Sequence, residues 1–198
     1  EGHRKATLIM HTEPTDAEGP NLFATAAELG IQSNVFFSRE RLEFEKMNVL
    51  YNITDFCINI AFAEGFGLST LEAMMTGTPI IAAKTGGVTR QVVNHKTGNE
   101  NGVALNIDLK TLVGSQNVPY IYEDYVTNKN ASAGIMKLYK MWKRKPQEYK
   151  KLRKKVLNYA RTEFSHQKIV DLWDASMTKT IENFKENRNE ISWKVFDY

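Results

Sequence analysis

The chain has 198 residues, of which 42% are hydrophobic and 25% are charged, and its formal net charge is +3. This composition excludes an intrinsically disordered chain, and the absence of a long apolar run or a leader-like start argues against a membrane span and a signal peptide. Cys57 is the only cysteine, which excludes an internal disulfide and a thiolate metal cluster and mildly favours an intracellular setting.

Short apolar runs rich in β-branched or aromatic residues alternate with helical patterns, which is typical of a parallel sheet flanked by helices. Strands are predicted at residues 6–11, 35–37, 55–60 and 80–83, and helices at 22–29, 42–53, 70–76 and from the Gly86-Gly87 turn to Val93. Residues 55–60 are almost continuously apolar, so we expect that strand to be buried on both faces. The predicted fold class is α/β, with a Rossmann-like parallel sheet.

Residues 94–126 interrupt this alternation. We interpret them as a β-rich excursion with extended stretches at 103–107 and 118–122, which the segment DLKTLVGSQN connects. Residues 127–186 then have a helical pattern that breaks at Pro146. The sequence therefore predicts a single lobe over residues 1–198 that contains the excursion and ends in C-terminal helices.

The helical stretch on both sides of Pro146 is strongly basic. Residues 137–155 contain ten Lys or Arg and one acid, Glu148. Apolar residues recur between the cations at helical spacing, so we interpret the lysines as solvated faces of two helices. Contact with an anionic membrane surface is the alternative, and no nucleic-acid partner is expected.

A glycine-containing loop follows the predicted strand at 55–60, which is where open parallel sheets bind their ligands. It lies in the segment AEGFGLSTLE, residues 63–72. Gly65 and Gly67 allow backbone N–H groups to approach a ligand, and the partial positive charge at a helix start suits a diphosphate. A purely structural alternative is that Ser69 and Glu72 form a capping box and that Glu64 is an ordinary exposed carboxylate.

The two glutamates of this segment, Glu64 and Glu72, are separated by seven residues. Together with the flanking sequence from NVFFSRERLEF to IIAAKTGGV, they resemble the C-terminal domain of retaining GT-B glycosyltransferases of the "glycosyl transferases group 1" type, also called family four. The resemblance extends over about residues 8–164, and FSHQKIVDLW is similar to the family's closing helix. It implies the C-terminal half of a GT-B fold.

The resemblance also implies a set of site residues. They are Glu64 as the catalytic residue, Glu64, Gly65, Phe66 and Gly67 around the donor sugar, and Leu68, Ser69 and Glu72 at the nucleotide and its phosphates. Glu64 would accept hydrogen bonds from sugar hydroxyls and Glu72 from the ribose hydroxyls, because a carboxylate can bind two vicinal hydroxyls. The nucleotide base would lie at the turn Phe37-Ser38-Arg39, mostly against backbone.

This sequence departs from the family pattern in several ways. Ala61-Phe62 stands where Pro-Ser is usual, and the excursion over 103–126 is longer than the usual connection. The family's Gly-Arg and Lys-Gly cations, and its N-terminal domain with the acceptor site and an important histidine, would all precede Glu1. We therefore expect part of a larger enzyme that lacks the first, central strand and is inactive alone, and we expect Trp193 and Phe196 in its tail to be exposed.

The expected function is transfer of a sugar from a UDP-, GDP- or ADP-linked donor to a hydroxyl acceptor with retention, in the cytoplasm or peripheral to a membrane. We expect no cofactor and no metal, because the histidines are dispersed at positions 3, 11, 95 and 166. Two alternatives stay open. One is another GT-B enzyme, such as a nucleotide-sugar epimerase or a phosphorylase, and the other is a non-catalytic module that binds a nucleotide sugar or docks on a membrane.

Overall fold

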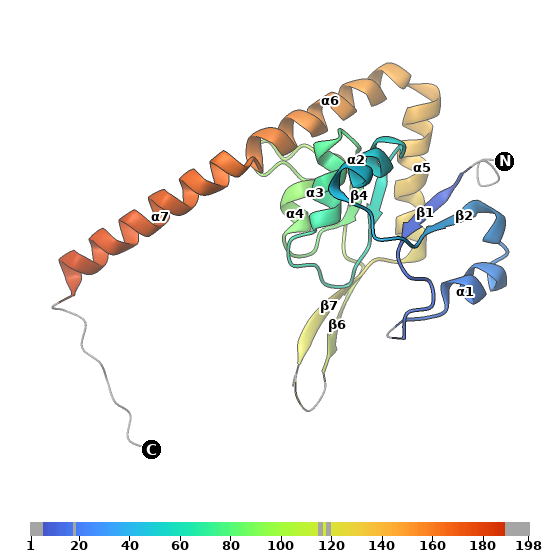
Figure 1. Cartoon of the computed structure of the whole chain (residues 1–198), viewed down its shortest axis with the longest axis horizontal. Helices are drawn as coiled ribbons and strands as arrows, with labels where there is room; N and C mark the ends of the chain where they lie inside the picture. The colour runs from blue at the N-terminus through green and yellow to red at the C-terminus, as the bar shows by residue number, and fades with distance from the viewer. Residues whose placement is uncertain (1–5, 18, 115–116, 118–119, 189–198) are drawn as a thin grey trace. The chain divides into compact units, whose positions relative to one another are not determined.

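The computed structural model describes residues 6–17, 19–114, 117 and 120–188. Trp193 and Phe196 lie outside the described residues. The chain divides into two compact units, residues 1–47 and 48–198. Helix α2 (Phe44–Asn52) crosses the boundary between the units. Figure 1 shows the helices and strands of both units.

The first unit is built around a pair of parallel strands. Its elements are β1 (Leu8–His11), α1 (Leu22–Glu28), the 3-10 helix η2 (Gln32–Asn34) and β2 (Val35–Ser38). Leu8 pairs with Val35 and His11 with Ser38, so the two strands run in register over their whole length. Helix α1 begins where the Asn21 side chain accepts a hydrogen bond from Ala24 N.

The second unit contains the larger sheet and most of the helices. Its elements after α2 are β3 (Cys57–Asn59), α3 (Leu68–Met75), β4 (Ile80–Ala83), α4 (Val88–Val92), β5 (Gly102–Leu105), β6 (Leu109–Val113), β7 (Ile121–Tyr125), α5 (Asn128–Arg144), α6 (Pro146–Glu163) and α7 (His166–Asn187). Strands β3, β4 and β5 form a three-stranded parallel sheet with β4 in the centre. The predicted alternation of strands and helices is therefore confirmed.

The core of this unit lies on both faces of β4. Ile80 and Ala82 pack with residues of α3, α4 and α6, whereas Ile81 and Ala83 pack with residues of β5 and α5. Alternate residues of a strand point to opposite faces, so one short apolar strand supplies both clusters. The sheet therefore has α3 and α4 on one side and α5 on the other, as Figure 1 shows.

The strand at 55–60 differs from the prediction. Only Cys57–Asn59 form β3, and all three residues are half-buried rather than buried. Among the described residues, β3 pairs with β4 alone, so one of its edges has no neighbouring strand. All four residues of the central strand β4 are buried, in contrast. The apolar pattern predicted the strand but could not reveal that it lies at an edge.

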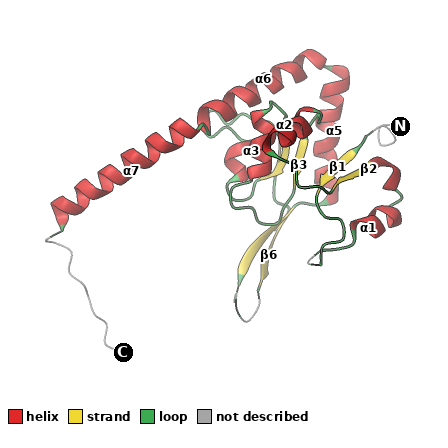
Figure 2. Cartoon of the chain, viewed as in Figure 1, coloured by secondary structure: helices red, strands yellow, loops and turns green. Residues whose placement is uncertain are grey.

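The connection predicted between the two extended stretches is also partly wrong. Leu109–Val113, inside the segment DLKTLVGSQN, form strand β6, which pairs antiparallel with β7. Alternation of Leu109, Thr111 and Val113 on one face suits a strand, and the turn residues begin only at Gly114. Within the excursion, residues 102–105 thus belong to the parallel sheet as β5, and β6 and β7 form a separate two-stranded antiparallel pair, drawn in yellow in Figure 2.

The C-terminal helices begin at recognisable signals. Pro146 occupies the first position of α6, and the Ser165 side chain caps α7 by accepting a hydrogen bond from Lys168 N. The fold class predicted from the sequence is confirmed: the chain is α/β, with parallel sheets, flanking helices and C-terminal helices. The described parallel strands form a pair and a triplet rather than one six-stranded sheet. The interpretation of residues 1–198 as one lobe stays a prediction.

Candidate functional site

The Glu64 carboxylate is held by the segment around it. Its Oε1 accepts a hydrogen bond from Gly67 N at 3.1 Å, and its Oε2 accepts one from Asn59 Nδ2 at 3.3 Å. Asn59, the last residue of β3, also accepts from Ala61 N through its Oδ1 at 3.0 Å. The side chain of Glu64 is half-buried. Its position is therefore fixed by the end of the strand and by the start of the next helix.

Gly67 directly precedes helix α3 and has a backbone conformation that suits glycine. Its φ is +83°, in the left-handed region, and a Cβ there would lie 2.5 Å from Cγ2 of Val88. Gly67 is the residue before the helix, and no side chain caps that end. Ser69 lies inside the helix, so the capping box considered from the sequence is not formed. Glu72, which would be the partner of Ser69 in a capping box, accepts a hydrogen bond from Tyr51 instead.

Glu72 accepts a hydrogen bond from the Tyr51 hydroxyl to its Oε2 at 2.9 Å. Burial, together with this bond to Glu72, raises the pKa of Tyr51 well above its usual value, so the phenol remains a donor at neutral pH. Tyr51 comes from α2 and is a functional candidate that the sequence analysis missed. Glu72 itself is exposed.

A second glycine pair, Gly86 and Gly87, packs its backbone against the backbone of the loop. Gly87 N donates to Gly65 O at 2.9 Å. A Cβ on Gly86 would lie 1.8 Å from Glu64 O, and a Cβ on Gly87 would lie 2.5 Å from Gly65 O. The turn that the sequence showed before α4 is therefore part of the site, because only glycine lets the two backbones approach so closely.

Gln91 of α4 is another residue of this region that the sequence analysis did not identify. It is fully buried, and its Nε2 donates to the carbonyl oxygens of Phe66 and Gly67. Its neighbours Val88 and Val92 share the buried face of the helix. A glutamine among apolar residues on a helix is a signal that could have indicated a buried polar contact.

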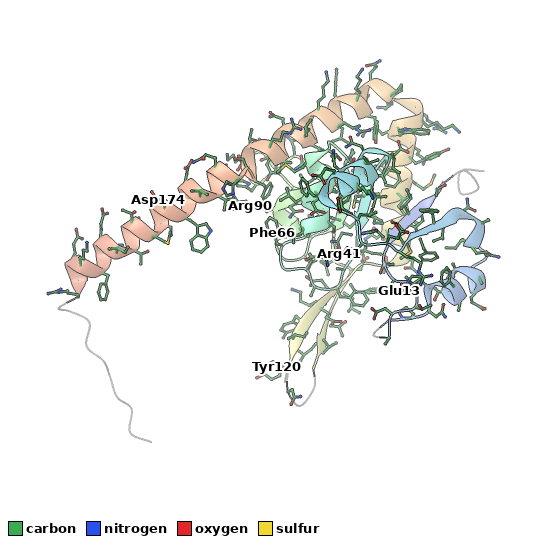
Figure 3. The ribbon with its side chains drawn as sticks, in the orientation of Figure 1. Glu13, Arg41, Phe66, Arg90, Tyr120 and Asp174 are labelled. Atoms are coloured by element: carbon green, nitrogen blue, oxygen red, sulfur yellow. The ribbon has the colours of Figure 1, made fainter. Side chains whose placement is uncertain are left out.

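The predicted site residues lie together on the surface. Gly65, Phe66, Leu68, Ser69 and Glu72 are exposed, Glu64 is half-buried, and Gly67 is buried. The loop is therefore not covered by neighbouring helices. The Phe66 side chain, labelled in Figure 3, is 43% exposed and contacts Phe164 edge to face, with 6.1 Å between the ring centroids.

The hairpin touches the segment that leads into the loop. Asp124 N donates to Phe62 O at 2.7 Å, and the rings of Phe62 and Tyr125 lie 5.8 Å apart. Phe62 is one of the two residues that replace the usual Pro-Ser. The two departures from the family pattern that the sequence showed are therefore in contact with each other.

The described residues contain no group of three or more His, Cys, Asp or Glu that could hold a metal ion. Burial raises the pKa of the Cys57 thiol to about 11, so this residue is uncharged at neutral pH and is a poor metal ligand. No helix among the described residues has both the length and the apolar character needed to cross a membrane.

Comparison with known proteins confirms the resemblance. Residues 17–103 match the family described as "Glycosyl transferases group 1", and this range includes the whole glycine loop and Glu72. The D-inositol 3-phosphate glycosyltransferase of Corynebacterium efficiens is 36% identical over 73 residues. The aligned stretch covers 37% of this chain and 17% of that relative, so the chain spans only a small part of the relative's length.

Two solved structures share the fold of this chain. Sucrose-phosphate synthase from Thermosynechococcus elongatus superposes with a TM-score of 0.62 at 19% identity, over 89% of this chain and 38% of that one. Anabaena Alr3699/HepE in complex with UDP superposes with a TM-score of 0.59 at 17% identity, over 86% of this chain and 41% of that one. The chain thus has the fold of a GT-B glycosyltransferase domain.

Proposed function

We propose that this chain is the donor-binding part of a glycosyltransferase that moves a sugar from a nucleoside-diphosphate sugar to a hydroxyl acceptor with retention. The observation that carries the proposal is the Glu64 carboxylate, which Asn59 and Gly67 hold beside the exposed N-terminal end of α3. A fixed acceptor for hydroxyl groups next to free helical N–H groups suits a sugar that is joined to a diphosphate. The name of the curated relative and the UDP in the Anabaena structure support this proposal.

The proposed roles follow the order of residues along the loop. Glu64 would accept hydrogen bonds from donor-sugar hydroxyls, with Gly65 and Phe66 beside the same ring. Gly67 would act through Glu64, because its N–H already donates to that carboxylate. Glu72, oriented by Tyr51, would accept from the ribose hydroxyls.

Catalysis would come mainly from fixed dipoles at the diphosphate. Negative charge develops on the diphosphate as it leaves, and N–H groups that are already oriented stabilise this charge more in the transition state than in the ground state. The N–H groups of Leu68 and Ser69 in the first turn of α3 are the donors for this role, because the first four N–H groups of a helix have no partner within it. We propose that an N-terminal GT-B domain supplies the acceptor site, and that the cations come from another part of the full-length enzyme outside this chain.

Two substitutions test these roles in the full-length enzyme. Glu64→Gln should lower kcat sharply with little effect on the affinity for the free nucleoside diphosphate, because the lost charge faces the sugar. Glu72→Ala should weaken nucleotide binding about tenfold to a hundredfold, because a charge-assisted hydrogen bond contributes about 1.5–3 kcal/mol. Calorimetric titration with UDP, GDP and ADP, combined with turnover assays, measures both. Wild-type values of kcat and affinity in both variants would refute the assignment.

The basic helices support a second, weaker proposal, which is contact with an anionic membrane. Exposed cations on α5 and α6 include Lys140, Lys143, Lys150 and Lys154, and Trp142 between them is 44% exposed. Vesicles with and without anionic lipid would test it. Binding that depends on anionic lipid supports the contact, and equal sedimentation with neutral vesicles contradicts it.

A further inference from the structure

The buried amide of Gln91 connects helix α4 to two consecutive carbonyl groups of the glycine loop. Its Nε2 lies 2.6 Å from Phe66 O and 3.2 Å from Gly67 O. Its Oε1 accepts a hydrogen bond from the Thr70 hydroxyl in α3, so both ends of the amide have partners. Asn101 Nδ2 in turn donates to the backbone oxygen of Gln91 at 2.8 Å. This glutamine is therefore fixed on all sides and is not available to a ligand.

The peptide group between Phe66 and Gly67 has a partner at each end. Its carbonyl oxygen accepts from Gln91, and its N–H, which belongs to Gly67, donates to Glu64 Oε1 at 3.1 Å. The C=O and the N–H of a trans peptide point in opposite directions, and the described residues contain no cis peptide bond. Gln91 thus lies on one side of this peptide and the Glu64 carboxylate on the other.

Glycine at position 67 makes this peptide easy to rotate. Gly67 has a φ of +83°, and a residue without a Cβ reaches both signs of φ at little cost. A flip of the Phe66–Gly67 peptide would turn its N–H away from Glu64 and bring a carbonyl oxygen towards the carboxylate. The hydrogen bond from Gln91 Nε2 to Phe66 O opposes this flip, because the flip would remove the partner of a buried N–H group. The bonds of Gln91 to Gly67 O and Thr70 do not involve this peptide and keep the amide in place.

We propose that Gln91 is a positioning residue that locks the Phe66–Gly67 peptide, so that the Gly67 N–H holds the Glu64 carboxylate at the donor sugar. Gln91 touches neither sugar nor phosphate and acts only through the loop. The consequence for sugar binding rests on the function proposed above. The locking of the peptide can be tested without any ligand.

The experiment compares three variants of the chain. Gln91→Met removes both donor and acceptor, and Gln91→Glu keeps a similar shape with one donor, because a buried carboxyl group stays protonated. Val92→Ala is the matched control, since Val92 is equally buried on the same helix but packs in the hydrophobic core with an apolar side chain that cannot hydrogen-bond to the loop. Amide hydrogen exchange, resolved by residue with NMR, measures protection of the Gly67 N–H.

The Gly67 N–H should exchange about tenfold faster in Gln91→Met than in Val92→Ala, with Gln91→Glu between them. The affinity for UDP-glucose should fall more than the affinity for UDP, because Glu64 faces the sugar. Wild-type protection of Gly67 in Gln91→Met, or equal loss in the control, would overturn the proposal. If Gln91→Met does not fold, Gln91→Glu decides by the same comparison.

The two proposals can fail separately. Faster exchange at Gly67 in a protein that binds no nucleotide would support the locking role and refute the proposed function. Nucleotide binding with unchanged protection of the Gly67 N–H in the Gln91 variants would support the proposed function and refute the locking role.

Discussion

Gly86 has a φ of +45°, and a Cβ at this position would lie 1.8 Å from the carbonyl oxygen of Glu64. Gly86→Ala should therefore displace the glycine loop, since the obstructing atom belongs to the backbone and cannot move like the end of a side chain. We expect the variant to have a lower Tm and a much weaker affinity for a nucleoside diphosphate. Thermal unfolding and calorimetric titration measure the two effects.

Gly98→Ala is the matched control for this change. Gly98 also has a positive φ, +71°, but nothing lies within 4 Å of its missing Cβ. Both variants carry the strain of a left-handed alanine, about 1 kcal/mol, and only Gly86→Ala adds the collision. Equal nucleotide affinities for the two variants would contradict the contact between Gly86 and the loop.

At the level of single residues, the sequence motif identified the residues of the glycine loop. It did not identify the side chains from other helices that hydrogen-bond to this segment. Glu64, Gly65 and Gly67 lie in one continuous motif that local patterns can reveal. Tyr51 meets Glu72 across 21 residues, and Gln91 meets Phe66 across 25. Contacts over such separations depend on how the helices pack, which no local pattern encodes.

Among the helices, Glu163 at the end of α6 binds two cations. Lys168 Nζ of α7 donates to its Oε2 at 2.7 Å, and Lys96, from the turn after α4, donates to its Oε1. His95 Nε2 lies 3.7 Å from the same carboxylate. The hydrogen bonds from Lys168 and Lys96 lower the pKa of Glu163 to about 2. This carboxylate therefore connects α6, α7 and the turn at 94–98.

The lowered pKa predicts a dependence of stability on pH. A group with a lowered folded-state pKa stabilises the protein fully above its usual pKa of 4.5, and this stabilisation is lost as the pH falls towards 2. Glu163→Gln should therefore lower Tm at pH 7 and have progressively less effect below pH 4.5. Thermal unfolding of both proteins across this range tests it. A Tm difference that stays constant with pH would show that the ion pairs do not contribute.

Elements with a clear period were predicted well from the sequence. Strand β4 has the predicted bounds, and α6 begins at Pro146 as expected. The wrong predictions concern strands with an exposed edge or face. Strand β3 is shorter and more exposed than predicted, and the residues of β6 were predicted to connect two strands rather than to form one. Hydrophobic patterns report burial, so they are least informative where strands lie at an edge or in an exposed hairpin.

For the whole molecule, the alternation of strands and helices along the sequence predicted the α/β class. It did not predict which strands pair with each other. The parallel strands form one pair, β1 and β2, and one triplet around β4. Strand β3 is half-buried, and among the described residues only β4 pairs with it. A structure of the full-length protein would show whether another strand pairs with β3.

The central claim is that the glycine loop and its two glutamates bind a nucleoside-diphosphate sugar. Its most direct test is a titration of the isotope-labelled chain with UDP up to about 1 mM, a weak-binding range, followed by NMR at each backbone amide. If the loop binds the nucleotide, the largest shifts will occur at Gly65–Ser69 and at Glu72. Shifts confined to the basic helices α5 and α6, or unchanged amides throughout the loop, would contradict it.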